Sequence, residues 1–320
     1  MKRFLRNCTA LLLAVAALLW LGGTAYRRTT TYRNLERDEE TEKYESLPET
    51  VTFAVFGPSH GRDAFQAADY GPGFFNFSMS SQTPQYDWML MRQFRDRIAP
   101  GATVVLTVSY LSPFWTDTEA FFESKQARYY RILSPENIVN CDVGRWVLER
   151  WSPLLTTDCA SVLSAFLRPP ALREDTNTLY GRQELTPEVL RDEEERIRRD
   201  HIDASIEPAM PEGNPVMLDA YRQMLALCRE RGWNAVLVTP PYPAVYTDCF
   251  SPEILERFRA LTAELSEENG VPWLNYSQDG DFTENFPYFK NIDHLNLAGA
   301  HAFAARVQAD LAALGAGDGR

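Results

Sequence analysis

The sequence Phe53-Ala-Val-Phe-Gly-Pro-Ser-His-Gly61 joins an apolar, strand-like run to an abrupt stop at Gly57-Pro58. The stop places Ser59 and His60 in the turn that follows the strand. Ligands bind outside the carboxyl ends of the strands in open α/β sheets, so a hydroxyl in this turn is well placed for chemistry. An isolated serine after a strand is usually only a turn residue or a helix N-cap. Ser59 therefore needs a partner before it can be read as a nucleophile.

A histidine that fits this role lies near the carboxyl end of the chain. The segment Asn291-Ile-Asp-His-Leu-Asn-Leu-Ala-Gly299 places His294 immediately before a helical pattern of apolar residues. A serine nucleophile needs such a base within hydrogen-bond reach. We therefore predict that Ser59 Oγ and a ring nitrogen of His294 lie within hydrogen-bond distance.

Further apolar runs indicate the fold class. Five of them, separated by helical patterns, predict an α/β fold, in which a parallel sheet of about five strands carries helices on both faces. The runs are 51–56, 74–77, 103–108, 235–239 and 273–276.

The segment between the third and fourth runs, roughly 120 residues, is far too long for an ordinary loop. We predict an insertion at 111–215 that forms a cap over the carboxyl edge of the sheet. Its first half is rich in aromatic residues, and its second half contains a charged, helix-like run at 187–200. The aromatic side chains either line a groove for sugar rings or complete the core. The aromatic residues are Phe114, Trp115, Phe121, Phe122, Tyr129, Tyr130, Trp146 and Trp151.

The amino terminus predicts export. Lys2, Arg3 and Arg6 precede an uncharged run at 9–26 that is just long enough to span a bilayer. We predict a signal anchor at 1–26, a polar stalk at 27–50 and a folded domain at 51–320. Gly23-Thr-Ala25 also resembles a signal-peptidase site, so a cleaved and secreted form is the alternative. Either way the domain at 51–320 lies outside the cytoplasm.

Composition excludes some classes of function. The net charge of −12 and the pI near 4.9 argue against binding to nucleic acid. The sequence has no zinc-type Cys/His spacing, phosphate-binding glycine loop or dinucleotide motif, so it predicts no metal and no cofactor. Among the five cysteines, Cys141 and Cys159 are the favoured disulfide pair, with two unrelated thiols as the alternative. Cys228 lies in a helical pattern and is expected to be buried.

The segments around Ser59 and His294 resemble the first and last blocks of the SGNH (GDSL-like) hydrolase and acyltransferase superfamily. Between them, Asn76-Phe-Ser-Met-Ser-Ser-Gln-Thr83 is similar to the second block. The resemblance is nearest to the membrane-anchored branch, which includes D-alanyl-lipoteichoic acid type proteins and the alginate and peptidoglycan O-acetylation proteins. It implies a three-layer, flavodoxin-like fold and an O-acyltransferase or esterase that acts on a cell-envelope polysaccharide. A membrane-bound O-acyltransferase partner, as acyl source, is also implied.

The sequence departs from the family pattern at the oxyanion site. Ser81 replaces the second-block glycine, and the third-block asparagine has no clear equivalent, so that Ser109, Tyr110 or Ser112 is left to supply a hydroxyl. We expect backbone amides near His60 and Ser81 to bind the oxyanion. Asn76 and Ser80 complete the predicted oxyanion and substrate site.

A third departure concerns the acid of the triad. Asn291 stands three positions before His294, where the family has aspartate, and Asp293 is directly adjacent to the histidine. An asparagine oxygen accepts the imidazole N–H bond but lacks the charge that stabilises an imidazolium. Adjacent loop residues point in different directions, so we expect Asn291 to orient the ring, with Asp293 as second candidate.

Two other functions fit the same residues. One is a secreted esterase or lipase for small esters, and the other is an envelope scaffold that keeps the fold but has lost the chemistry. His201 and His301 have no partner at metal-ligand spacing and are expected to be structural or exposed.

Overall fold

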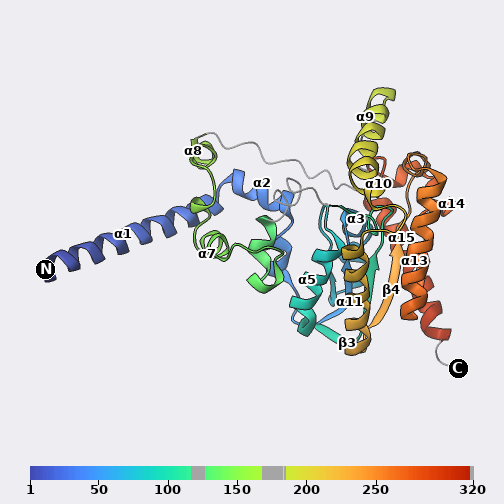
Figure 1. Ribbon diagram of the computed structural model, residues 1–320, viewed down its shortest axis with the longest axis horizontal. Coiled ribbons are helices and arrows are strands. Elements are labelled where there is room, and N and C mark those ends of the chain that lie inside the picture. Colours follow the sequence, from blue (N-terminus) through green and yellow to red (C-terminus); the bar gives the residue numbers. More distant parts are fainter. Residues whose placement is uncertain (117–126, 168–182, 184, 318–320) are drawn as a thin grey trace. The chain divides into compact units, whose positions relative to one another are not determined.

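The computed structural model describes residues 1–116, 127–167, 183 and 185–317 (Figure 1). The chain forms two compact units. The smaller consists of Met1–Ser46 and Glu123–Glu174, and the larger of Leu47–Phe122 and Asp175–Arg320. The expected insertion at 111–215 is therefore divided, because its central part belongs to the unit that contains the amino terminus.

A five-stranded, all-parallel sheet forms the centre of the larger unit. The strand order is β2-β1-β3-β4-β5, which is the order of flavodoxin-like folds. The predicted α/β class is confirmed, with each strand followed by helical structure. The strands are β1 (Val51–Phe56), β2 (Phe74–Asn76), β3 (Ile98–Thr107), β4 (Asn234–Thr239) and β5 (Trp273–Asn275).

The central strands are apolar because both of their faces are covered. Val104, Val105 and Leu106 of β3 are fully buried, which is typical of a parallel sheet between two helical layers. β3 begins at Ile98, earlier than the apolar run at 103–108 predicts. Val51 pairs with Ile98, and a register shift between Val51 and Phe53 accommodates the extra length.

Helices cover both faces of the sheet (Figure 1). α5 (Pro84–Phe94), α11 (Pro215–Arg231) and α13 (Pro252–Asn269) pack side by side in one layer, whereas α3 (Ser59–Ala64) packs with α15 (Leu297–Gly317) in the other. A continuous core between the sheet and α15 includes Val55, Val105, Val236, Phe303 and Val307.

The long helices begin and end where local chemistry specifies. Thr83 caps α5, Asn214 caps α11 and Ser251 caps α13, and proline follows each of these residues at the first helical position. Gly232 and Gly270 end α11 and α13 in the left-handed conformation that favours glycine.

Shorter elements connect these layers. The second half of the insertion forms α9 (Pro187–Ile197), which continues into the π-helical segment η5 (Arg198–Ile206) and α10 (Glu207–Ala209). The helix that the charged run predicts is thus present. The remaining elements are α4 (Ala67–Tyr70), η2 (Arg95–Arg97), α12 (Ala244–Thr247), α14 (Gly280–Thr283) and η6 (Phe286–Tyr288).

The smaller unit is built around the end of the amino-terminal helix. Tyr26, Tyr32 and Ala165 are buried together, with Leu154 and Val162 packed against them. The segment expected as a polar stalk at 27–50 therefore contributes a helix and a buried tyrosine to a folded unit. Its elements are α1 (Lys2–Arg27), α2 (Thr30–Glu39), η1 (Glu42–Ser46), η3 (Pro135–Asn137), α7 (Val143–Trp151), η4 (Pro153–Leu155) and α8 (Cys159–Leu167).

The expected disulfide is absent, because Cys141 and Cys159 are both free thiols. Cys141 precedes α7 and Cys159 begins α8, so the whole of α7 and η4 separates them. Cys228 is buried in α11, as its helical pattern predicts. α1 is long and apolar enough to span a membrane, and little of its apolar stretch is buried in the protein.

Candidate active site

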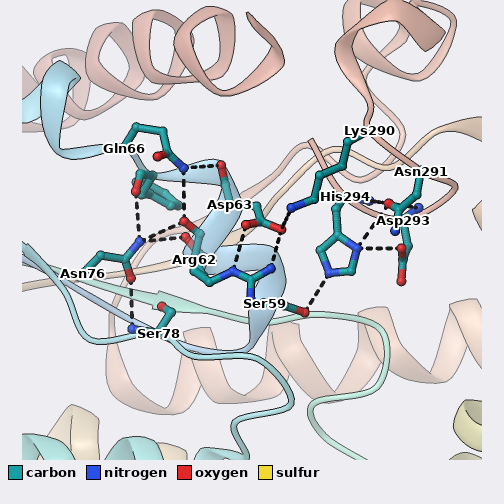
Figure 2. Close-up of polar contacts among 12 residues, drawn as sticks. Ser59, Arg62, Asp63, Gln66, Asn76, Ser78, Lys290, Asn291, Asp293 and His294 are labelled. Carbon is teal, nitrogen blue, oxygen red and sulfur yellow. Dashed lines mark hydrogen bonds and ion pairs between the residues drawn. The ribbon is translucent and has the colours of Figure 1, made fainter. Parts of the chain in front are cut away.

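Ser59, His294 and Asp293 form a continuous chain of hydrogen bonds (Figure 2). Ser59 Oγ lies 2.7 Å from His294 Nε2, and His294 Nδ1 lies 2.6 Å from Asp293 Oδ1. An ionised carboxylate only accepts, so Nδ1 carries the proton and Nε2 accepts from the serine. The predicted Ser59–His294 contact is confirmed, in the geometry of an activated nucleophile.

Close packing fixes the helix that carries Ser59. Gly57 has a φ of +148°, which only glycine adopts easily, and it ends β1 where the chain turns into α3. A Cβ on Gly61 would lie 2.6 Å from Thr107 Oγ1 and 2.9 Å from Ser78 Oγ, so α3 sits directly on the end of β3. Ser59 is the first residue of this helix.

Asn76 also holds α3 in place. Its side-chain nitrogen donates to the carbonyl oxygens of Gly61 and Phe65, at 3.0 and 2.9 Å, and its oxygen accepts the N–H of Ser78 (Figure 2). Asn76 thus ties the nucleophile's helix to the turn after β2. The sequence predicts Asn76 at the oxyanion or substrate site, but its amide is used in this structural role.

A pinned hairpin presents His294. Phe289 and Leu295 form an antiparallel bridge, and the Lys290 N–H donates to the His294 carbonyl at 2.9 Å. Lys290 Nζ lies 2.8 Å from the buried carboxylate of Asp63, which also pairs with Arg62. Asp63 belongs to α3, so this ion pair links the helix of the nucleophile to the hairpin of the base (Figure 2).

The expectation that Asn291, rather than Asp293, orients the His294 ring is wrong. Asn291 Oδ1 accepts the backbone N–H of His294 at 2.8 Å and that of Asp293 at 3.3 Å, and lies 3.3 Å from His294 Nδ1. The asparagine thereby forms the sharp turn that an adjacent residue needs to reach the ring. Asp293 Oδ1 makes the shorter contact with His294 Nδ1, at 2.6 Å, so the group that orients the ring is a carboxylate.

Asp293 is ionised despite its burial. Its side chain is 3% exposed, and burial by itself raises the pKa of a carboxyl group. The neighbouring His294, which also donates a hydrogen bond, and then His60 and Arg196 outweigh that effect and hold the pKa of Asp293 well below its usual range. The negative charge that stabilises a developing imidazolium is therefore in place.

His60 lies against the triad as a second, uncharged imidazole. Its ring stacks on that of His294 with centroids 4.8 Å apart, and meets Tyr242 edge-on at 5.0 Å. Burial, followed by the proximity of His294, lowers the pKa of His60 to about 3, although Asp293 opposes the shift. Neither ring nitrogen has a hydrogen-bond partner among the described residues. His60 is thus neutral at physiological pH and packs as an apolar support against the His294 ring.

The burial of neutral His60 predicts that the free energy of unfolding falls as the pH is lowered. The folded state keeps His60 neutral down to pH of about 3, whereas the unfolded chain binds a proton below about 6.5, so stability rises with pH across this window. One such group contributes a slope of up to about 1.4 kcal/mol per pH unit. We expect His60→Phe to reduce the slope of unfolding free energy against pH between 4.5 and 6.5, measured by denaturant titration in detergent. An identical slope in the variant and the wild type would contradict this account.

A cavity of about 170 Å³ opens at the triad. Seven of the eleven candidate residues line it: Ser59, His60, Ser80, Ser81, Ser109, Asp293 and His294. They follow strands β1, β2, β3 and β5, so the carboxyl edge of the sheet brings them together, as predicted. Tyr110 does not line the cavity, because it is buried in an aromatic cluster with its hydroxyl 3.3 Å from Thr247 Oγ1. Asn76 and Asn291 have the structural roles described above.

The two segments expected to supply oxyanion donors, around His60 and Ser81, border the cavity. The first backbone bonds of α3 run from the Gly61 and Arg62 N–H groups to the Pro58 carbonyl. The N–H groups of Ser59 and His60 lie before these bonds, at the start of the helix, where helical N–H groups have no partner within the helix. Ser81 has a φ of 51°, in the left-handed region, within the turn after β2. These amides belong to two segments that border the same cavity.

The insertion supplies residues that the sequence does not assign to the site. Arg196 and His201, from α9 and η5, line the triad cavity, and Arg196 Nη2 lies 3.7 Å from Asp293 Oδ2. Burial lowers the pKa of His201 to about 4, and its Nδ1 lies 3.5 Å from the Tyr246 hydroxyl, so the residue is packed within the protein. A charged helical run gives no sign of which residues turn inward. His301 pairs with Asp69 at 2.8 Å, away from these residues, as expected.

A second cavity, of about 430 Å³, adjoins the first. The two share Ser81, Leu111, Trp115, Arg196 and His201. Trp115 is thus the one predicted aromatic residue among the described part of the chain that lines both cavities. Phe114 is buried, whereas Tyr129, Tyr130, Trp146 and Trp151 belong to the other unit. Phe121 and Phe122 lie outside the described residues.

A metal would compete with the triad for the same atoms. His60, Asp293 and His294 offer ligand atoms that lie within 4.8 Å of one another, a donor set that suits transition metals. Both ring nitrogens of His294 are hydrogen-bonded, to Ser59 and to Asp293. A metal bound by His294 would have to displace one of these bonds.

Comparison with known proteins gives little further information. No model of a known protein family matches the chain, and no curated protein sequence matches it. One solved structure, a Bacillus subtilis protein from a structural genomics programme, is similar at 16% identity with a TM-score of 0.39. The match covers 83% of this chain and 57% of that protein, so the chain spans little more than half of the protein that it matches.

Proposed function

We propose that this protein is a membrane-anchored, SGNH-like serine O-acyltransferase or esterase that acts on a cell-envelope polysaccharide. The observation that carries the proposal is the Ser59–His294–Asp293 chain, with contacts of 2.7 and 2.6 Å at the mouth of a cavity. The order of the sequence blocks and the parallel sheet agree with this family. The aligned triad, with its ionised acid, favours an active enzyme over an inactive scaffold.

The first half of the reaction forms an acyl-enzyme. Ser59 Oγ attacks the carbonyl carbon of an acyl ester while His294 Nε2 takes the serine proton, and Asp293 stabilises the resulting imidazolium. The amides at the start of α3 and in the turn at Ser81 stabilise the oxyanion. His294 then returns its proton to the departing alcohol. Ser59 is left as an ester.

The second half transfers the acyl group. An acceptor hydroxyl gives its proton to His294 and attacks the Ser59 ester, and His294 returns the proton to the departing Ser59 Oγ, which restores the serine. A sugar acceptor in the transferase yields a new ester, whereas water in the esterase yields a free acid. The adjoining cavity of 430 Å³ lies in the size range of small-molecule sites and can hold part of a saccharide. The acyl group would come from an ester supplied by a membrane-bound O-acyltransferase.

The proposed location is the outer face of the cell membrane, with α1 as an uncleaved anchor. Lys2, Arg3 and Arg6 would face the cytoplasm. Gly23 is in such close contact with Ser152 that an added Cβ would lie 2.5 Å from Ser152 Oγ. Cleavage after Ala25 would remove this contact, which supports retention of the helix over a secreted form.

An acyl-transfer assay tests the proposal. The full chain, purified in detergent, would receive an aryl acetate as donor and a soluble envelope polysaccharide as acceptor. We expect aryl alcohol release to exceed free acetate, with the difference recovered as acetyl ester on the polysaccharide by mass spectrometry. Acetate release equal to alcohol release with every acceptor would support the small-ester esterase. No release with any donor would support the inactive scaffold.

A further inference from the structure

The smaller unit exposes an apolar face on α7, η4 and α8. Between 37% and 69% of the surface of eight large apolar side chains is exposed there. α8 contains no charged residue along its whole length. Solvated helices normally turn polar residues outward, and a contiguous apolar face marks a surface that something covers. The eight residues are Val143, Val147, Leu148, Trp151, Leu155, Leu163, Phe166 and Leu167.

This face is attached to the apolar part of α1. Ser152 Oγ, at the corner between α7 and η4, donates to the Leu19 carbonyl at 2.9 Å. An added Cβ on Gly22 would lie 2.8 Å from Leu154 Cδ1, so η4 also rests directly on the helix. The neighbouring side chains Leu18, Trp20 and Leu21 of α1 are exposed. The end of α7 and η4 therefore adjoin the apolar part of α1.

The attachment lies at the depth of a membrane interface. A hydrocarbon core of about 30 Å takes up about 20 helical residues, which from Asn7, after the last amino-terminal arginine, reach to the region of Tyr26. Leu19 lies about two helical turns before Tyr26, which is on the order of 10 Å along the axis. Interfacial helices bury their apolar face about 5 to 10 Å into the boundary between headgroups and acyl chains.

Several polar groups near this face are hydrogen-bonded within the protein. Arg27 donates to the carbonyl of Arg150 at 2.9 Å, close to the end of α7, and Arg150 donates to carbonyls of Tyr130 and Leu133. The Trp146 indole N–H donates to the Leu133 carbonyl at 2.8 Å. Backbone and side-chain polar groups that are bonded internally remove the main cost of contact with lipid.

We propose that the face formed by α7, η4 and α8 inserts into the outer leaflet of the bilayer around α1. The occupant is lipid, because the face adjoins the apolar part of α1 at interfacial depth. Trp20 and Trp151 would lie in the belt that aromatic residues favour. The proposal rests on the anchor proposed above, but it does not depend on the chemistry of Ser59.

Carbene labelling from within the bilayer tests this surface. The full chain would be reconstituted in phosphatidylcholine vesicles with an apolar diazirine reagent, photolysed and mapped by peptide mass spectrometry. We expect labelling of α7 and α8 within a few-fold of that of α1. Val216, an equally exposed apolar residue on α11, is the matched control and should be labelled at least tenfold less. The Ser59→Ala variant should show the same pattern, which separates this result from the catalytic proposal.

Label confined to α1, as would occur if a second copy of the chain covers the face, would overturn the proposal. Absence of label in α1 as well would overturn both the anchor and the surface. A charge variant provides a second measurement. Leu163→Glu should reduce labelling of Phe166 at least threefold by lifting α8 from the lipid, whereas Val216→Glu should leave it unchanged. Undiminished labelling of Phe166 in Leu163→Glu would also count against insertion.

Discussion

Ser59→Ala should lower kcat for an aryl ester at least 10³-fold, because the remaining oxyanion donors and binding contacts provide only a small part of triad catalysis. Ser59 Oγ is the atom that His294 Nε2 contacts at 2.7 Å, and alanine cannot form the acyl-enzyme. Initial rates with the detergent-purified full chain provide the measurement. The half-buried hydroxyl contributes little to folding, so the free energy of unfolding should change by less than about 1 kcal/mol.

A matched serine variant controls for the substitution itself. Ser46→Ala removes an exposed hydroxyl that donates to the Lys43 carbonyl, so it should leave the rate as in the wild type. Ser59→Ala activity within tenfold of the wild type would mean that another residue is the nucleophile. Equal losses in both variants would show that the assay reports stability rather than chemistry.

Asp293→Asn should lower kcat by about 10³- to 10⁴-fold, the scale of the loss when a triad carboxylate becomes an amide. The amide loses the negative charge and no longer holds the imidazole in the tautomer that accepts the serine proton. KM should change little, since Asp293 contacts His294 and does not line the adjoining cavity of about 430 Å³ proposed to hold the acceptor. Steady-state kinetics in detergent would separate the two constants.

Asn291→Asp is the informative comparison. An aspartate there keeps the oxygen that accepts the backbone N–H groups of Asp293 and His294, so the turn survives and the loss should be far smaller. A large gain of activity in Asn291→Asp, together with a mild effect of Asp293→Asn, would restore Asn291 as the residue that orients the ring.

The fold was readable from the sequence because its signals are local. The five apolar runs and the long intervening segments specify a parallel sheet directly. Ser59 is predictable because it follows the carboxyl end of a strand, and His294 because it immediately precedes a helical pattern. The sequence does not indicate the start of β3 at Ile98, because Pro100 and Gly101 resemble a turn and pairing with β1 extends the strand.

The site is only partly predictable, because the spacing of residues along the sequence does not show where their side chains point. Asn291 has the family spacing, yet its oxygen caps the turn, and that turn lets the adjacent Asp293 reach the ring. Asn76 and Tyr110 carry suitable chemistry but point into structural contacts. Arg196 and His201 lie in a charged helix whose inward face depends on tertiary packing. The division of the insertion between two units is likewise a long-range property that composition cannot reveal.

The most direct test of the central claim is mass mapping of the covalent adduct formed by a serine-directed fluorophosphonate. The full chain would be treated, digested and sequenced by tandem mass spectrometry. We predict a single phosphonylated site at Ser59, with adduct formation slowed at least 10³-fold in the Asp293→Asn variant by the same loss of charge. Modification at another serine, or no adduct under conditions that fully modify a known serine esterase, would contradict the assignment of Ser59, His294 and Asp293 as a catalytic triad.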